Sequence, residues 1–347
     1  MSRADRFLKA CRREPVDCTP VWMMRQAGRY LPEYREIRAK HTFLEMCKTP
    51  EVAAEVTIQP VRRYEIDAAI IFADILLPLE PMGIGFHFAP EGGPVIERPI
   101  RSGRDVKGVR AIDPRTELDY VMQTLRLVRR EIDGKTPLIG FAGAPYTLAS
   151  YVIEGGHTRD YAHVKTLMFD DPTTFNRLME LLAEVCAGYL LAQIEAGAQA
   201  VQLFDSWVGW LGPYDYERHV LPHVRYVVDQ VRGHGAPVIY FANGASGMLD
   251  LVSRVGADVY GVDWRIGLDR AWEQLGADVA VQGNLDPLTL LGPQAAIEER
   301  VTDVLRRARG RPGHVFNHGH GLVPQIDPDN VRYLVDAVHR LSAGARD

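Results

Sequence analysis

The sequence predicts a single-domain (β/α)8 barrel of the TIM type, and three observations support this fold class. The chain of 347 residues is long enough to bury one large core. Eight short β-prone runs recur along it, and their apolar residues are continuous rather than alternating, as in strands that are buried on both faces. Amphipathic helical patterns separate these runs, and such strand–helix alternation is typical of parallel α/β folds.

The eight expected strands are short and contain mainly aliphatic and aromatic residues. In chain order they cover residues 21–24, 68–72, 138–141, 200–204, 238–241, 259–262, 279–282 and 314–317. An open doubly wound sheet is the alternative for such a pattern. Neither a GxGxxG fingerprint nor a P-loop accompanies any of these strands, so the barrel is favoured.

The expected helices lie between the strands, and the clearest of them covers residues 172–196. Asp171 is a suitable N-cap, Pro172 suits the first helical position, and Gly197 follows the end. A shorter helix is expected to begin at Pro32. The remaining helical patterns cover residues 50–64, 115–131, 215–232, 246–255, 293–309 and 328–342.

One segment interrupts this alternation of strands and helices. Residues 85–100 contain the turn sequence Glu91-Gly92-Gly93 between two β-prone stretches, which predicts an inserted β-hairpin. No repeat or break in composition marks a second domain. We therefore expect residues 1–347 to form one domain.

The charge balance limits the classes of ligand. A net charge of −5 and an isoelectric point near 6.1 argue against binding to nucleic acid or to a membrane surface, which requires a basic face. Local positive charge must therefore capture any anionic substrate. The first 48 residues provide some of it, with 11 Lys and Arg against 6 Asp and Glu.

The cysteines and the N-terminal residues predict a cytoplasmic protein. The chain has four cysteines without CxxC spacing, which fits a reducing compartment. Its first residues contain no apolar core of a signal peptide, and acidic side chains among them argue against a transit peptide. No stretch approaches the roughly 18 apolar residues that span a bilayer.

Polar residues follow the expected strands at the points where these end. In a barrel of this type, the C-terminal ends of the strands carry the catalytic groups. The residues in question are Arg25, Arg29, Asp74, Tyr146, Tyr151, Glu154, Asp205, Ser206, Asn243, Asp263, Asn284, His318 and His320. Each alone is ambiguous, since strand ends become polar loops, and Asn243-Gly244 is most simply a turn. Together they favour a site at this end of the barrel.

Two features of this set indicate an anionic ligand and a carboxylate with a specific role. Arg25 and Arg29 lie four residues apart directly after the first strand, and guanidinium groups bind carboxylates and phosphates in pairs. The alternative is a pair of surface salt bridges to Glu33 or Glu36. Asp74 is flanked by apolar residues, where a carboxylate must be hydrogen-bonded, paired or functional.

The sequence lacks the motifs of several common catalytic mechanisms. The chain has no HExxH motif and no GxSxG elbow, and no lysine directly follows an expected strand, which leaves a Schiff-base mechanism without its amine. His318 and His320 could bind a metal together with Asp74. Such histidine pairs more often serve as hydrogen-bonded structure or as acid–base groups.

Longer segments resemble a known family. PVWMMRQAGRYLPEYRE and GFAGAPYTLASYVIEGG are similar to the two signature segments of the uroporphyrinogen decarboxylases. IIFADIL, QLFDSW, and GHGL with the following IDPDNV resemble further motifs of this family, in the family's order. The resemblance extends from about residue 4 to residue 340, which is nearly the whole chain.

This resemblance implies a (β/α)8 barrel that acts as a homodimer in haem and tetrapyrrole biosynthesis. It implies that the enzyme, a carboxy-lyase, converts the four acetate side chains of uroporphyrinogen III to methyl groups, giving coproporphyrinogen III and CO2. No cofactor, no metal, no nucleic acid and no membrane are implied. The tetrapyrrole uroporphyrinogen would be the small-molecule substrate.

The resemblance also assigns site residues by motif position. The substrate-binding residues would be Arg25, Gln26, Ala27, Gly28, Arg29, Asp74, Tyr151, Ser206 and His320, and the catalytic residues would be Asp74, Arg25, Tyr151 and His320. One departure concerns His318, because the family commonly has an apolar residue at that position. His320 is therefore the residue that matches the family histidine.

The chemistry of the residues agrees with this assignment. Arginines suit a polyanionic substrate, since hydrogen bonds to charged groups contribute about 1.5–3 kcal/mol each. The four pyrrole N–H groups at the centre of the macrocycle need an acceptor such as ionised Asp74. Protonation of a ring carbon would make the pyrrole an electron sink, and Asp74 would stabilise the resulting cation. Tyr151, His320 and Arg25 remain alternatives for the proton donor.

Two other functions compete with this one. A corrinoid-linked methyltransferase resembles this family in fold, but it needs a zinc thiolate site, and no cysteine follows Cys186. A tetrapyrrole carrier without activity would bind the macrocycle and leave its mass unchanged.

Overall fold

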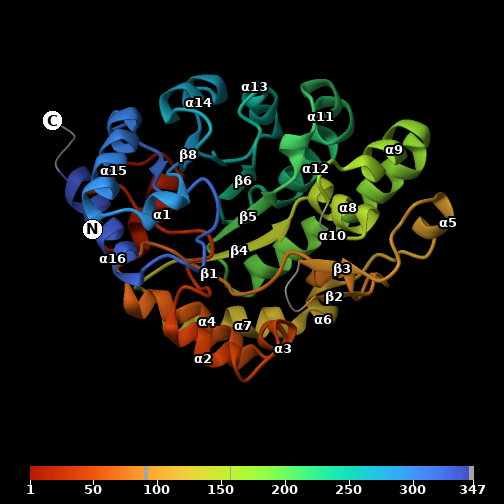
Figure 1. Cartoon of the computed structure of the whole chain (residues 1–347), viewed down its shortest axis with the longest axis horizontal. Coiled ribbons are helices and arrows are strands. Elements are labelled where there is room, and N and C mark those ends of the chain that lie inside the picture. The colour runs from red at the N-terminus through yellow and green to blue at the C-terminus, as the bar shows by residue number, and fades with distance from the viewer. Residues whose placement is uncertain (90–92, 157, 344–347) are drawn as a thin grey trace.

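A curled parallel sheet of seven strands forms the centre of the protein (Figure 1). The computed structural model describes residues 1–89, 93–156 and 158–343. In sheet order the strands are β1 (Ala69–Ile70), β4 (Leu138–Gly143), β5 (Ala200–Asp205), β6 (Val238–Ala242), β7 (Val259–Gly261), β8 (Ala280–Gln282) and β9 (His314–Val315). They correspond to seven of the eight predicted strands, and neighbours in the sheet are neighbours along the chain, as in a barrel.

The predicted strand at residues 21–24 is wrong as a strand, although its place in the barrel is right. Only Val21 forms a parallel bridge, to Phe316, and Phe316 donates its N–H to the carbonyl of Pro20 at 2.8 Å. On the other side, Asp67 donates its N–H to the carbonyl of Val21 at 2.8 Å. This segment therefore joins β9 to the start of β1. It ends early because the amide of Met24 bonds to the Asn317 side chain instead of continuing a ladder.

The best-defined predicted helices are confirmed. α10 (Pro172–Glu195) has Asp171 as its N-cap, and the side chain of Asp171 accepts the N–H of Thr174 at 3.0 Å. Gly197 just beyond its end has a φ of +116°, a conformation that glycine adopts without strain. The other matching helices are α2 (Pro32–Arg38), α4 (Pro50–Arg63), α15 (Gln294–Ala308) and α16 (Pro328–Ser342).

Three predicted helices are each divided into two pieces. The pieces are α6 (Pro114–Glu117) and α7 (Asp119–Glu131), α11 (Pro213–His219) and α12 (Leu221–Val231), and α13 (Leu249–Val252) with the 3-10 turn η3 (Ser253–Val255). Pro222 explains one division, because proline cannot continue a helix but fits its first turn.

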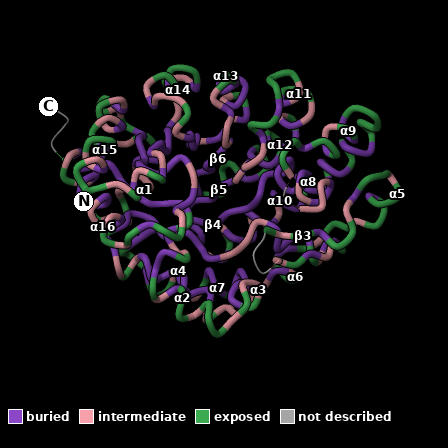
Figure 2. Tube along the Cα trace, viewed as in Figure 1, coloured by how far each residue is buried: buried purple, intermediate pink, exposed green. Residues whose placement is uncertain are grey.

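Further elements were not predicted. They are α1 (Arg3–Cys11), α3 (Phe43–Lys48), α5 (Gly103–Val106), α8 (Pro145–Glu154), α9 (Ala162–Asp170), α14 (Leu268–Leu275), and the 3-10 turns η1 (Leu77–Leu79), η2 (Val208–Trp210) and η4 (Pro287–Leu291). Helices surround the sheet and turn their buried faces toward it, while green exposed faces point outward (Figure 2). Within the described ranges, none of the helices combines the length and apolarity that crossing a bilayer requires.

The predicted hairpin is present. β2 (Phe86–Phe88) and β3 (Pro94–Ile96) pair antiparallel, although residues 90–92 of the expected turn lie outside the described residues. Ile96 donates its N–H to the carbonyl of Gly155 at 2.8 Å, and Ile100 donates to Val152 at 2.8 Å. These bonds attach the hairpin to the C-terminal half of α8, beside the sheet (Figure 1).

Candidate active site

The segment after Val21 makes a tight turn that presents Arg25. Gln26 is fully buried and fixes this turn, since its side-chain oxygen accepts the N–H of Met23 at 3.1 Å and its amide donates to the carbonyl of Ala68 at 3.1 Å. The Gln26 side chain thus serves the turn itself. Arg25 has a left-handed φ of 61°, and its side chain is exposed to solvent.

Two glycines permit the close packing around Arg25. A Cβ on Gly28 would lie 2.9 Å from the carbonyl oxygen of Arg25, and a Cβ on Gly321 would lie 2.4 Å from the Arg25 Cδ atom. The side chain of Arg25 therefore lies directly over the backbone that follows His320. Residues almost 300 positions apart in the chain meet here.

Arg29 belongs to a wider group of arginines. Together with Arg35, Arg38, Ala39 and Pro324 it lines a groove of about 520 Å³. Arg35 and Arg38 were not predicted as site residues, although their spacing of three places them on one face of a helix. Among the described residues, neither Arg25 nor Arg29 forms an ion pair, and Glu33 pairs with Arg63 at 3.2 Å instead. The salt-bridge alternative for the arginine pair is therefore wrong for Glu33.

Asp74 follows β1 and remains partly accessible. Its Oδ1 accepts the N–H of Leu76 at 2.9 Å. Burial raises the pKa of Asp74 to about 6, and both this hydrogen bond and the positive charge of Arg25 oppose the increase. Asp74 thus lies within the electrostatic range of Arg25 and is still mainly ionised at neutral pH.

Tyr151 lies on α8 and faces the same region. Its ring meets that of Trp207 edge-to-face at 5.7 Å between centroids. Burial raises the pKa of Tyr151 to about 12, and the negative charge of Asp74 adds to this. Trp207 also contacts Tyr161 at 5.7 Å, so aromatic rings form one side of the site.

His320 and His318 have different surroundings. His320 is partly buried and packs edge-to-face on Trp264, with 6.5 Å between centroids. Burial lowers the pKa of His320 to about 4, helped by the charges of Arg25 and Arg265. His318 is completely buried, and neither of its ring nitrogens has a hydrogen-bond partner. Across the described ranges, no group of three His, Cys, Asp or Glu is arranged to hold a metal, so the site of Asp74 with both histidines is not formed.

Several other predicted residues hold loops or the core. Asp205 is buried and accepts hydrogen bonds from Thr147 at 2.7 Å and from Tyr240 at 2.8 Å. Glu154 accepts the N–H of Val164 at 2.9 Å, at the start of α9. The hydroxyl of Tyr146 is buried without a partner. Asp205 and Glu154 are thus engaged in internal hydrogen bonds, whereas the Tyr146 hydroxyl is not.

The loops after β5, β6 and β8 are fixed in the same manner. Ser206 is partly exposed, and its carbonyl accepts the side-chain amide of Asn243 at 3.1 Å. Gly244 has a φ of +76°, which agrees with the turn expected at Asn243-Gly244. Asn284 is buried and donates to the carbonyls of Asp263 at 2.9 Å and Ile266 at 2.7 Å. Ser206 and Asn243 thus remain partly accessible at the strand ends, whereas Asn284 is buried.

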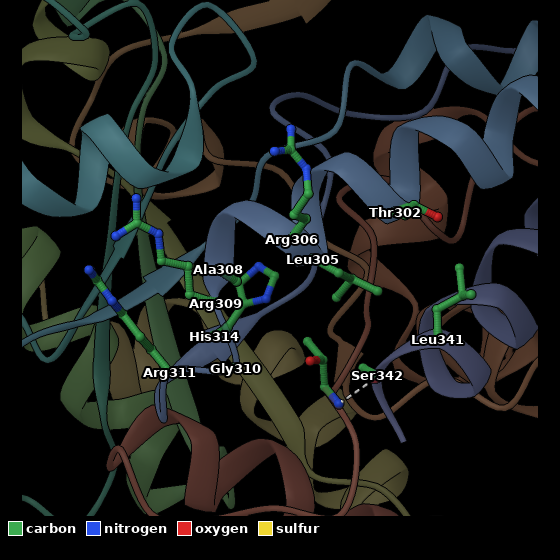
Figure 3. Close-up of a pocket in the computed structure, with 11 residues that line it drawn as sticks. Thr302, Leu305, Arg306, Ala308, Arg309, Gly310, Arg311, His314, Leu341 and Ser342 are labelled. Atoms are coloured by element: carbon green, nitrogen blue, oxygen red, sulfur yellow. Dashed lines mark hydrogen bonds between the residues drawn. The ribbon is translucent and has the colours of Figure 1, made fainter. Parts of the chain in front are cut away.

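A separate cavity of about 320 Å³ lies at the start of β9 and contains none of the predicted site residues (Figure 3). It surrounds His314, the first residue of β9, and includes Leu305 and Leu341. The guanidinium groups of Arg306 and Arg309 extend away from His314 in this view. Arg311 also lines this cavity, which therefore has three arginines in its wall, as the Arg29 groove has.

Comparison with known proteins gives a consistent result. A family model described as uroporphyrinogen decarboxylase matches residues 2–341. Proteins named uroporphyrinogen decarboxylase are similar in sequence: one from Carboxydothermus hydrogenoformans is 58% identical, covering 98% of this chain and 97% of the relative. Another, from Sorangium cellulosum, is 55% identical, covering 97% and 96%.

Solved structures share the fold. A methyltransferase from Methanosarcina mazei superimposes with a TM-score of 0.81 at 18% identity, over 98% of this chain and 99% of the other. At this identity the likeness concerns the fold alone. It confirms the alternating strand and helix architecture over the full length.

Proposed function

The chain belongs to the uroporphyrinogen decarboxylase family, and we propose that it removes the four acetate carboxyl groups of uroporphyrinogen III as CO2, giving coproporphyrinogen III. It is a carboxy-lyase of tetrapyrrole biosynthesis. The observation that supports a common site is the packing of the Arg25 side chain against Gly321, which follows His320. The charge of Arg25 also affects the pKa values of Asp74, Tyr151 and His320, which come from three other segments of the chain. Such coupling requires them to share one region at the strand ends.

Substrate binding would rest on the arginines. Arg25 and Arg29 are exposed, and neither is engaged in an ion pair within the described chain, so their donors are available for side-chain carboxylates. Charge-assisted hydrogen bonds of this kind contribute about 1.5–3 kcal/mol each. We assign Ala27 and Gly28 a role through their backbone, and Ser206 a role at the rim.

Asp74 would occupy the centre of the bound macrocycle. An ionised carboxylate only accepts hydrogen bonds, and the inner pyrrole groups only donate them. Its Oδ1 holds one internal hydrogen bond, from Leu76, so acceptor capacity remains for a ligand.

The reaction needs an electron sink, and the substrate can provide it. Addition of a proton to the ring carbon that lies between the nitrogen and the acetate-bearing carbon converts the pyrrole to a cation. The bond to the carboxylate then breaks, CO2 leaves, and the bonding electrons enter the ring to form an exocyclic methylene group. Protonation of that methylene and loss of a ring proton give the methyl product. Asp74 would stabilise the cation electrostatically, without any cofactor.

The pKa values argue against His320 as the proton source and leave Tyr151 protonated. With a pKa of about 4, His320 is a neutral imidazole at pH 7, which suits a hydrogen bond to the substrate better than acid catalysis. Tyr151 keeps its proton at this pH because its pKa is about 12. Arg25 is permanently charged and would orient the scissile carboxylate.

The rate should depend on the ionisation of Asp74. Because burial raises the pKa of Asp74 to about 6, its active ionised form is lost as the pH falls through that value. We expect kcat/KM to be nearly constant from pH 7 to 8 and to decrease about tenfold per pH unit well below 6. Steady-state rates between pH 5 and 8 measure this. A kcat/KM that stays constant from pH 7 down to pH 5 would contradict the raised pKa of Asp74.

The activity itself is tested by anaerobic incubation of the purified protein with uroporphyrinogen III, followed by mass spectrometry. We expect successive losses of up to four CO2, equally with and without a metal chelator. An unchanged substrate mass together with binding would indicate a carrier and contradict the proposed activity.

We also propose that the enzyme acts as a homodimer in the cytoplasm. The family resemblance supports the dimer, and so do large exposed aromatic side chains, with Trp210 50% and Tyr214 68% accessible. Light scattering coupled to size-exclusion chromatography measures the mass of the assembly.

A further inference from the structure

An arginine that the sequence did not single out lies on the side of the site opposite Asp74. Arg265 follows β7, and Asp74 follows β1. Along the sheet, β4, β5 and β6 separate these two strands in one direction, while β8, β9 and the segment at Val21 separate them in the other. In a closed arrangement of eight positions, the two loops therefore face each other across the mouth.

The Arg265 side chain is stacked and only lightly engaged. Its guanidinium carbon lies 4.3 Å from the centroid of the Trp264 ring. It forms an ion pair with Oδ2 of the buried Asp263 at 3.3 Å and reaches Oδ1 of Asn243 at 3.5 Å, both long for hydrogen bonds, and the side chain is 48% exposed. With five donors on a guanidinium, most of its hydrogen-bonding capacity remains unused.

The loop that carries Arg265 is held rigidly. Asn284 donates to the carbonyls of Asp263 and Ile266, which bracket Trp264 and Arg265. Oδ1 of Asp263 accepts the N–H of Arg265 at 2.8 Å, and its Oδ2 accepts the N–H of Gly244. The backbone therefore fixes Asp263, and the cation is presented without a flexible loop.

The same loop is packed against the residues that follow β9. A Cβ on Gly319 would lie 2.4 Å from the backbone nitrogen of Trp264, and the Trp264 ring contacts His320. Arg265 also contributes to the low pKa of His320. Arg265, Trp264 and His320 thus form a stack that reaches from the rim to the proposed site.

We propose that Arg265 binds a side-chain carboxylate of the substrate on the side of the macrocycle away from Arg25 and Arg29. This inference rests on the proposed function. A tetrapyrrole carries acidic arms around its whole circumference, and Arg25 and Arg29 both belong to a single loop. Arg265 stands on a hydrogen-bonded loop, is half exposed, and keeps donors free beside its long ion pair with Asp263, as a second anchor requires.

The test compares Arg265→Gln and Arg265→Lys with the wild type under anaerobic conditions. For Arg265→Gln we expect KM for uroporphyrinogen III to rise about tenfold, while kcat stays within about twofold. For Arg265→Lys we expect a smaller rise in KM, because lysine keeps the positive charge. Wild-type KM should also rise more steeply with added KCl than that of Arg265→Gln, because a charge contact is screened. The matched control is Arg254→Gln, since Arg254 is 54% exposed and pairs with Glu217 away from the strand exits.

A second measurement identifies the carboxylate and separates this inference from the proposed function. Coproporphyrinogen III retains the propionates and lacks the acetates, so its Kd is measured for the same proteins. If Arg265→Gln binds both ligands more weakly than the wild type, Arg265 contacts a propionate. If it binds only uroporphyrinogen III more weakly, Arg265 contacts an acetate. If KM and Kd of Arg265→Gln both stay within twofold of wild type, the inference is overturned. Failure of the wild type to release CO2 would instead overturn the proposed function, and the Kd comparison would still test Arg265.

Discussion

Replacing Asp74 with asparagine is expected to lower kcat by at least about 10²–10³-fold while KM changes much less. The reason is that asparagine retains the shape and one acceptor oxygen but not the negative charge. Binding depends mainly on the arginines, whereas the ring cation exists only during the reaction. The carboxylate is therefore needed more in the transition state than in the bound substrate.

Stability measurements separate this loss from misfolding. Burial raises the pKa of Asp74 above its ordinary value of 3.8, so at pH 8 the folded protein holds an ionised group that would be ionised more easily in the unfolded chain. Removing that charge relieves the unfavourable burial. We expect the melting temperature of Asp74→Asn at pH 8 to equal or exceed that of the wild type, despite the inactive site.

The matched control for Asp74→Asn is a nearby exposed carboxylate. Glu80→Gln alters an acidic side chain six residues further on that is 51% exposed and paired with Lys48, and it should leave kcat unchanged. Steady-state kinetics at pH 7.5 provide the comparison. If Asp74→Asn keeps kcat within about tenfold of wild type, equivalent to roughly 1.4 kcal/mol of barrier, the carboxylate does not stabilise the transition state.

The strands could be predicted from the sequence because burial on both faces leaves a continuous apolar run. The same logic explains the missed helix α8. Most of its residues are buried, including Thr147 and Ser150, so it shows no polar face and no helical period. The segment at Val21 resembles a strand in its apolar content, but it ends after one bridge because the N–H of Met24 donates to the side-chain oxygen of Asn317.

The sequence indicates which polar residues lie at the strand ends, but not which of them are free to face a ligand. Asp74, Tyr151 and His320 follow strands as expected, but so do Asp205 and Asn284, which the structure uses internally. Carboxylates and amides at strand ends bond to backbone as readily as to ligands, and sequence does not distinguish the two. The sequence does not single out Arg265, because its stacking on Trp264 is visible only in the structure.

The last large effect concerns Asp67, which joins both ends of the chain to the sheet. Its side chain is completely buried just before β1. Oδ1 accepts a hydrogen bond from Arg6 at 2.7 Å, and Oδ2 accepts the N–H of Val21 at 2.8 Å and lies 2.7 Å from the His339 ring nitrogen. One carboxylate thus holds α1, α16 and the segment that leads to Arg25.

Asp67→Asn is expected to lower the free energy of unfolding by about 3–5 kcal/mol. Both oxygens of Asp67 accept from donors, so the NH2 group of asparagine must face a donor at one of the two positions. The mutation also leaves the Arg6 guanidinium, only 11% exposed, with less compensation for its burial. Arg6 keeps its bonds to Asp17 at 2.7 and 2.9 Å, which prevents complete loss of the network.

Urea unfolding at pH 7.5, followed by tryptophan fluorescence and by circular dichroism, measures this effect. The control is Glu195→Gln, which breaks an ion pair with Arg115 in which both side chains are about half exposed, and it should cost under about 1 kcal/mol. Because Val21 leads to Arg25, Asp67→Asn should also raise KM while the protein is still folded. An unfolding midpoint equal to that of the control would mean that the barrel closes without this carboxylate, and that the position of Arg25 depends on Gln26 and Asn317 alone.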